Sequence, residues 1–480
     1  MPHLNKIIHE FIVFPEAISS NNWTLPAVAS TLTGTYLSKH GLVFDGDILS
    51  SRLITLPEYL FNNGYETLLF SSHPYLSGFS GLNRGFSRQF DNTPLNGFRL
   101  YEIIYRIIKA IKSKITAKKS SLNSGERHLN EPDHRKRKLS KFNLFWRWYL
   151  TYFSDRDARY KVKKFIKWFQ RERNINRNYF ALFHFFETHT PYIVPYKYRK
   201  KYITASTDKK KLWKVPQGIA YPKDYGMTDE DFRINEGIYN GAISYLDRIL
   251  FKLISFLKKT DNWQNTLLVM ISDHGENLGE HGLMYHKFVL YDTLIKIPMV
   301  FKLPRDFQIV NDHQIVQNVD IFPTIVDILG KYDERLRSQF MGNSLVSGNI
   351  KKRENYFAIS ELLKPWQNPP SSPDNLPEDL KKYLGRYIIS YRTKDFKYIH
   401  SSKGDHEYYD LVKDNNEKNN IINEVAEIHL NEIKKSLKPY LTSLKQKADL
   451  YHDRLTGKKK IDSTHISKDI MDSLQGLGYF

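Results

Sequence analysis

The spacing of apolar residues alternates between extended and helical periods along the chain. Short apolar runs bounded by polar residues predict strands at 67–72, 179–186, 266–272 and 297–303. Apolar positions that recur every three to four residues predict helices at 3–13, 54–63, 157–172, 236–258 and 322–330. Nearly continuous apolar strands separated by helices are typical of parallel strands covered on both faces. The pattern therefore predicts an α/β fold with a doubly wound, mostly parallel sheet.

The pattern changes after residue 345. Predicted strands at 356–360, 386–392, 396–400 and 407–411 follow one another without helices between them, and a final helix is predicted at 425–447. Strands and helices segregated in this way indicate a small α+β subdomain. We therefore divide the chain into a main domain, 1–345, and a C-terminal subdomain with its tail, 346–480.

Residues 103–141 interrupt the alternation with a basic segment. It carries about nine of the chain's twenty net positive charges. We predict a helical insertion whose central part, residues 115–140, is mobile and dispensable for folding, so limited proteolysis should cut there first. A charged surface excursion is the simpler interpretation, and contact with anionic lipid or a polyanionic substrate is the alternative.

Composition removes several kinds of site. The chain has no Cys, which excludes disulfides, thiolate metal sites and a cysteine nucleophile, so any metal must be held by oxygen and nitrogen ligands. No run approaches the roughly 20 apolar residues of a membrane span, and the N-terminal residues lack the features of a signal peptide, which predicts a cytoplasmic protein. The net charge of +20 favours nonspecific attraction to anions rather than specific nucleic-acid recognition, and the oligomeric state is not predicted.

The strongest motif is ISDHGENLGEHG at 271–282, directly after a predicted strand. Asp273 and His274 leave that strand at its carboxyl end, where open α/β sheets build their sites. A carboxylate beside an imidazole suits a divalent cation, so we predict both residues as metal ligands. In WTLPAVASTLTG, at 23–34, Thr24 lies near a predicted helix start, where unpaired backbone N–H groups favour anions. This is a suitable position for a nucleophile.

These motifs also resemble a known family. SDHGENLGEHG closely resembles the metal-binding loop of sulfatases, phosphonate monoester hydrolases and their relatives in the alkaline phosphatase superfamily. WTLPAVASTLTG resembles their nucleophile segment, HFFETHTPY their substrate-site histidine segment, and NVDIFPTIVDILG the helix that closes their catalytic domain. The resemblance implies an alkaline phosphatase-like fold and metal-dependent ester hydrolysis, with Ca, Mg, Mn or Zn as the cofactor and Ca or Mn favoured. The implied substrate is a small-molecule, glycan or lipid-head-group ester.

Carried over to this sequence, the resemblance makes Thr24 the nucleophile, and Asp273 and His274 the metal ligands. It makes His189 a contact of the substrate or leaving group, with a packing role as the alternative. Lys287 becomes a cation near the anionic oxygens of the ester, with an ordinary surface lysine as the alternative. We further predict a structural or supporting role for His286, and a helix cap for Asp320.

Two departures from the family pattern alter the expected chemistry. Sulfatases convert Cys or Ser to formylglycine within Cys/Ser-x-Pro-x-Arg, whereas residues 24–28 read TLPAV here. An unmodified Thr resembles instead the phosphoethanolamine and phosphoglycerol transferases, which attack phosphodiesters. The family's first strand, which ends in an Asp pair of the metal site, is also expected before residue 1.

Three interpretations follow for this missing strand: an upstream start, a fragment, or a noncatalytic relative. The leading hypothesis is a metal-dependent hydrolase of sulfuric or phosphoric esters, acting through Thr24. A phosphotransferase and a noncatalytic protein that keeps the fold are the alternatives.

Overall fold

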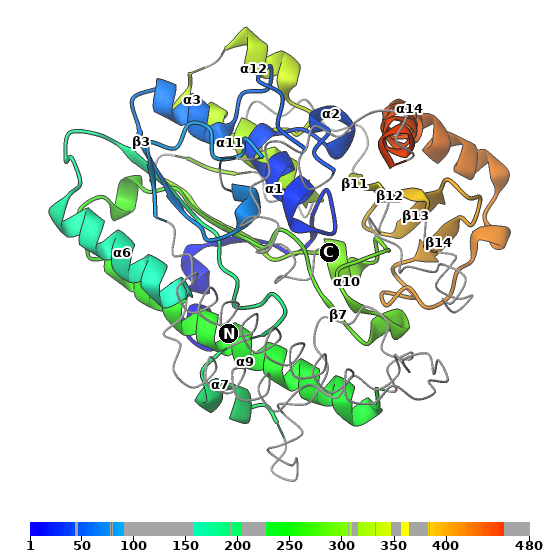
Figure 1. The fold of residues 1–480 in the computed structure, drawn as a ribbon, viewed down its shortest axis with the longest axis horizontal. Coiled ribbons are helices and arrows are strands. Elements are labelled where there is room, and N and C mark those ends of the chain that lie inside the picture. Colours follow the sequence, from blue (N-terminus) through cyan, green and yellow to red (C-terminus); the bar gives the residue numbers. More distant parts are fainter. Residues whose placement is uncertain are drawn as a thin grey trace, which may run out of the picture.

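A computed structural model describes the chain from residue 1 to 455, apart from 44–46, 91–156, 204–226, 310–314, 347–356, 364–382 and the single positions 77, 79, 193, 306, 332 and 384. The predicted insertion 103–141, with its proteolysis site at 115–140, lies outside the described residues. Figure 1 shows two layers of helices around the strands of the main part, with the C-terminal sheet at one side. Among the described helices, none combines the length and the apolar character that crossing a bilayer requires.

Two three-stranded sheets form the centre of the main part. One is parallel, in the order β4 (Arg88–Gln89), β3 (Glu66–Phe70), β5 (Tyr179–Phe183). The other is antiparallel, in the order β1 (Ile12–Phe14), β9 (Met299–Lys302), β6 (Leu268–Ile271). Two short pairs complete the main part: β2 (Ala17–Ile18) with β10 (Val316–Gln317), and β7 (Asn277–Leu278) with β8 (Met284–Tyr285).

Strands β5 and β6 lie between the same two layers of the core. Within the described residues β5 pairs only with β3, and β6 only with β9, and their side chains are all half-buried. Alternate residues of each strand pack against two different apolar clusters. One cluster includes Phe180, Leu182, Val269 and Ile271, and the other includes Tyr179, Ala181, Phe183, Leu268 and Met270. His184, which follows β5, lies 3.8 Å from Asp273, which follows β6, so the carboxyl ends of the two strands meet at one edge.

Helices cover both faces of these sheets. They are α1 (Thr24–Thr33), α2 (Leu37–His40), α3 (Leu56–Asn62), α6 (Asp157–Arg171), α7 (Tyr196–Lys200), α9 (Asp229–Leu257), α10 (Asp292–Ile295), α11 (Ile321–Leu329) and α12 (Glu334–Gln339). Helix α9 begins with a capping box between Thr228 and Asp231, and buries one face along most of its length. Helix α1 ends at Gly34, whose φ of 66° is the left-handed conformation that favours glycine.

The C-terminal part is an antiparallel sheet packed against one long helix. Its strands are β11 (Ala358–Leu363), β12 (Tyr387–Arg392), β13 (Phe396–Ser401) and β14 (Glu407–Asp410), in that order. Helix α14 (Glu427–Leu455) buries Ile433, Leu437 and Leu444 against it. The strands and helix predicted for this region are thus confirmed.

The α/β fold predicted from the sequence is confirmed, with two local differences. The helix predicted at 3–13 is wrong, because this segment forms two 3-10 turns, Leu4–Lys6 and Ile8–Glu10, and then strand β1. Ile12 and Phe14 pair with β9, and this pairing gives their backbone groups partners that a short isolated helix would not. Strand β9 also runs antiparallel to β6, which local periodicity does not reveal.

Candidate active site

Thr24 and His274 meet at the first turn of α1. Thr24 is the first residue of this helix and is 2% exposed, and its Oγ1 lies 3.2 Å from Nε2 of His274. Nδ1 of His274 lies 2.9 Å from the carbonyl oxygen of Gly275. In the tautomer with its proton on Nδ1, that carbonyl accepts the proton and the Nε2 lone pair faces the Thr24 hydroxyl.

Asp273 lies between the ends of β6 and β5. Its Oδ2 is 3.6 Å from Nε2 of His274 and 3.8 Å from Nε2 of His184, the residue that follows β5. Burial opposes ionisation of Asp273, but His274, His184 and the Thr24 hydroxyl together hold the pKa of its carboxyl well below its usual range. Asp273 is therefore an anion that faces two imidazoles and the hydroxyl of Thr24.

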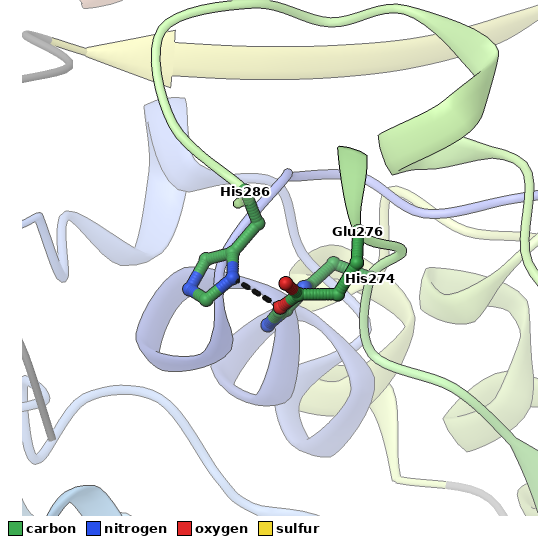
Figure 2. A group of neighbouring side chains, drawn as sticks. All are labelled: His274, Glu276 and His286. Carbon is green, nitrogen blue, oxygen red and sulfur yellow. Dashed lines mark hydrogen bonds and ion pairs between the residues drawn. The ribbon is translucent and has the colours of Figure 1, made fainter. Parts of the chain in front are cut away.

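A second set of donors adjoins His274. Figure 2 shows His274, Glu276 and His286 converging, with Nδ1 of His286 2.6 Å from Oε1 of Glu276. Tyr192 donates its hydroxyl to the other oxygen of Glu276 at 2.9 Å. Burial raises the pKa of Glu276 and lowers that of His286 well below its usual value. Within the described residues, Nε2 of His286 is buried without a hydrogen-bond partner, so this atom is available to a ligand.

His189 and Lys287 lie beside this cluster. The rings of His189 and His286 are 5.0 Å apart between centroids, and Nδ1 of His189 is 2.5 Å from the carbonyl oxygen of Thr190. Burial and the neighbouring His286 lower the pKa of His189 to about 3. Lys287 is half-buried with its Nζ 5.6 Å from the centre of the Tyr285 ring, and its charge contributes to the low pKa of His286.

The segment 283–291, which we call the site strap, carries both His286 and Lys287. Just before it His281 has a φ of 55°, and within it Tyr285 and Phe288 have φ values of 78° and 73°. Such left-handed conformations are costly for residues other than glycine, and they persist only where the surroundings fix them. Asn22 fixes the strap from the side of Thr24, because its Nδ2 donates to the carbonyl oxygen of Val289 at 3.0 Å.

The C-terminal sheet fixes the strap from the other side. Apolar residues of the strap share a cluster with residues of β12, β13 and β14, namely Leu283, Phe288, Val289, Leu290, Ile388, Ile399 and Tyr409. Lys397 of β13 is fully buried, and its Nζ donates to the carbonyl oxygen of Leu290 at 3.2 Å. The same ammonium lies 2.5 Å from Asp292 and 2.6 Å from Glu417. The strap is therefore held by contacts from both parts of the chain.

The donors around His274 fit a divalent cation. Its Nε2 is 3.2 Å from a hydroxyl and 3.6 Å from a carboxylate. Ligands bound at about 2.0–2.2 Å to one ion stand roughly 3 to 3.5 Å from each other, so this spacing suits coordination. The carboxylate of Glu276 and the imidazole of His286 adjoin this set. One ligand atom from each of His274, Glu276 and His286 lies within 4.8 Å of the other two. Oxygen and nitrogen donors are thus gathered at this edge of the sheet.

The structure brings together four of the five site residues predicted from the sequence, because Thr24, Asp273, His274 and His189 surround one edge of the sheet. The fifth, Lys287, lies on the strap next to these four. Sequence reasoning missed Glu276 and His184 as members of the site, and gave His286 only a supporting role. The Asp-His-Gly-Glu run was a signal for Glu276, whereas no sequence pattern marked His184. Asp320 directly precedes α11, as predicted for a cap, but its side chain makes no capping hydrogen bond to that helix. It accepts instead the backbone N–H groups of Gln317 at 2.8 Å, as part of a capping box on the 3-10 turn Asn318–Asp320, and of Asn343 at 2.7 Å.

Comparison with known proteins gives consistent results. The family described as Sulfatase matches residues 1–331, and the family described as N-sulphoglucosamine sulphohydrolase, C-terminal, matches residues 279–447. A choline-sulfatase of Rhizobium meliloti is 31% identical over 124 residues, 26% of this chain and 24% of that protein. Arylsulfatase K of Canis lupus familiaris is 26% identical over 205 residues, 42% of this chain and 36% of that protein. The chain thus matches about a quarter to a third of the length of these curated relatives.

Solved structures show the same fold. The phosphonate monoester hydrolase of Agrobacterium radiobacter superposes with a TM-score of 0.61 at 19% identity, covering 93% of this chain and 91% of that one. Because the first family match spans more than half of the sequence, this chain belongs to the sulfatase family of the alkaline phosphatase superfamily.

Proposed function

We propose that this chain cleaves phosphate or sulfate esters by a covalent route in which Thr24 is the nucleophile and a divalent cation is the cofactor. One observation carries the proposal: the Thr24 hydroxyl, at the first turn of α1, lies 3.2 Å from Nε2 of His274 and beside the Asp273 carboxylate. A hydroxyl is a weak nucleophile unless a neighbouring group lowers its pKa or accepts its proton. Here the Asp273 carboxylate can accept the proton, and the proposed cation would lower the pKa of the hydroxyl.

The first step joins Thr24 to the ester. Oγ1 of Thr24 forms a bond to phosphorus or sulfur, the bond from that atom to the leaving oxygen breaks, and the hydroxyl proton passes to a basic group of the site. The positive end of the α1 dipole favours the anionic ester at this position. In the second step water attacks the same atom, the bond to Oγ1 breaks, and Thr24 regains its proton.

His189 and Lys287 act on the ester's oxygens in this proposal. With its Nδ1 proton directed at the Thr190 carbonyl, neutral His189 offers an acceptor at Nε2. Its low pKa means that a role as proton donor requires an anionic ester nearby, because such a charge favours the imidazolium. The ammonium of Lys287 offsets negative charge on the nonbridging oxygens.

Asp273 and His274 would hold the cation, with Glu276 and His286 as further donors. Bound there, it would lower the pKa of the Thr24 hydroxyl and offset charge on the ester oxygens. Calcium prefers six to eight oxygen ligands, whereas imidazole suits the transition metals. Two imidazoles in the set therefore favour Zn over Ca, whereas the two carboxylates also suit Mn.

The nucleophile favours phosphorus over sulfur. A formylglycine hydrate can expel sulfate by collapse, but the Oγ1-bearing carbon of Thr24 has no second oxygen with which to do so. Transfer of a phosphoryl group from one oxygen to another is well suited to a site that stabilises charge electrostatically. If an alcohol instead of water attacks in the second step, the reaction is a phosphotransfer. The same covalent Thr24 intermediate therefore supports a phosphotransferase as the second candidate function. The substrate is an ester of a glycan, a lipid head group or a small molecule.

The test compares aryl phosphate, aryl phosphonate and aryl sulfate as substrates, with Mn, Zn, Mg and Ca added in turn. We expect the phosphorus esters to react faster, Thr24→Ala to abolish turnover, and Thr24→Ser to retain a part of it. The Ser variant is the matched control, because it keeps the hydroxyl and removes one methyl group. Sulfate hydrolysis that survives in Thr24→Ala would refute the nucleophile, whereas inactivity toward every ester would leave the noncatalytic alternative ahead.

A further inference from the structure

Asn22, two residues before Thr24, joins the segment that leads into α1 to the site strap. Its side chain is fully buried, and its Nδ2 donates to two backbone carbonyl oxygens of the strap, that of Val289 at 3.0 Å and that of His286 at 3.4 Å. A side-chain amide carries two N–H donors, so both bonds can form at once. The strap is thus held from this side at two points.

The two carbonyls lie on either side of the turn that carries Lys287. Within this turn the backbone N–H of Val289 donates to the carbonyl oxygen of Lys287 at 3.0 Å, and Phe288 has a φ of 73°. A three-residue turn with a left-handed central residue is strained and persists only where its surroundings hold it. Asn22 bonds the residue before the turn and the last residue of it, so its amide closes the turn.

Packing alone does not explain an asparagine at position 22. Within the described residues, Oδ1 of Asn22 is buried without a hydrogen-bond partner, and an unpaired buried acceptor destabilises the folded state. The neighbouring Asn21 uses both ends of its side chain, because its Nδ2 donates to the carbonyl oxygen of Glu361 and its Oδ1 accepts the N–H of Asn22 at 2.9 Å. The unpaired oxygen of Asn22 therefore indicates a role beyond folding.

We propose that Asn22 is a positioning residue for the reaction proposed above, and that its amide sets the distance between the Thr24 hydroxyl and the Lys287 ammonium. Two residues of chain span at most about 7 Å, so Thr24 follows any movement of Asn22 closely. Between them Trp23 is extended, with a φ of −152° and a ψ of 162°. Movement of the turn relative to Asn22 therefore moves Lys287 relative to Thr24. An ester held between these groups would lose its alignment, and small misplacements of reacting groups slow enzymes strongly.

Two variants separate positioning from a general loss of stability. Asn22→Ala removes both bonds to the strap. Gln339→Ala is the matched control, because Gln339 is 5% exposed and its Nε2 also donates to two backbone carbonyl oxygens, those of Thr33 and Ile54, both at 2.8 Å, near the opposite end of α1. Hydrogen exchange of residues 283–291 is measured by mass spectrometry. We expect this exchange to rise about tenfold or more in Asn22→Ala and to change less than about twofold in Gln339→Ala.

Kinetics test whether the order of the strap matters to the reaction. Lys287→Ala is combined with each variant, and kcat/KM is measured for an aryl phosphate. In the unaltered chain and in Gln339→Ala, we expect Lys287→Ala to lower kcat/KM about tenfold or more. In Asn22→Ala we expect a factor below about three, because the ammonium is already displaced. A purely structural Asn22 would leave the effect of Lys287→Ala the same in all three backgrounds.

An equal effect of Lys287→Ala in the three backgrounds would overturn the proposal, and so would strap exchange that Asn22→Ala leaves unchanged. If the unaltered chain hydrolyses no ester, the function proposed above fails, and the affinity for inorganic phosphate replaces kcat/KM in the same comparison. Coupling between Asn22 and Lys287 in phosphate binding would then support the positioning role without turnover, and its absence would contradict that role.

Discussion

Replacing Lys397 by Met removes the cation that ties the C-terminal sheet to the site strap. The ammonium is fully buried between Asp292 at 2.5 Å and Glu417 at 2.6 Å, and Met retains most of its volume. Removing one partner from a buried ion pair costs about 3–5 kcal/mol, because the remaining charge stays buried without compensation. Asp292 keeps its ion pair with Arg392 at 2.7 Å, so the lost compensation falls mainly on Glu417. We therefore expect Lys397→Met to lower the free energy of unfolding at pH 8 by about that amount.

The loss depends on pH through Glu417. Burial raises the pKa of its carboxyl to about 7, above its ordinary value of 4.5. A carboxyl whose pKa is higher in the folded state makes stability fall as the pH rises from about 4.5 to about 7. Removing Lys397 removes an attraction that favours the ionised form, so the pKa of Glu417 rises further. The variant should consequently lose less stability at pH 5 than at pH 8.

Urea unfolding followed by tryptophan fluorescence at pH 5 and pH 8 measures both quantities. Lys413→Met is the control, since Lys413 is 85% exposed and its pair with Asp410, at 3.3 Å, is screened by solvent, so its removal should change stability little. A loss in Lys397→Met below 1 kcal/mol, or one of equal size at the two pH values, would refute this account of the buried ion cluster.

Two further predictions concern other buried carboxylates and the metal. Burial raises the pKa of Glu361 to about 7, so its ionisation also lowers stability between about pH 4.5 and 7. Glu361→Gln should therefore reduce the difference in urea midpoint between pH 5 and pH 8. An unchanged difference would contradict this role of Glu361. Asp273→Ala and His286→Ala should each lower the Mn or Zn bound per chain in elemental analysis of the purified protein, whereas metal content equal to that of the unaltered chain would exclude that residue as a ligand.

The fold was predictable where burial alone determines a segment. The runs at 179–186 and 266–272 are apolar on both faces because each strand contacts two clusters, and this pattern needs no knowledge of the neighbours. Gly34 and Gly330 marked the ends of α1 and α11 because only glycine adopts their positive φ at little cost. Residues 3–13 were assigned the wrong structure because pairing with β9, a partner almost 290 residues away, overrides the local helical period.

The site was predictable where its residues are contiguous. Asp273 and His274 leave one strand together, so their proximity follows from the sequence. His286 reaches His274 only through a turn in which Gly279 has a φ of 132° and His281 one of 55°. Nothing in the residue type of a histidine signals a left-handed backbone. His184 enters through the alignment of β5 with β6, which is a property of the assembled sheets.

The left-handed residues of the site strap limit where the chain can be cut into separate parts. The strap belongs to the main part of the sequence, yet its backbone is held by Lys397 and by apolar residues of the C-terminal sheet. Residues 279–331 likewise fall within both family matches. A chain cut near residue 345 would release the strap to relax, and His286 with it. The two parts are therefore not interchangeable modules: in recombination or engineering, a C-terminal sheet from a relative must bring its own matching strap.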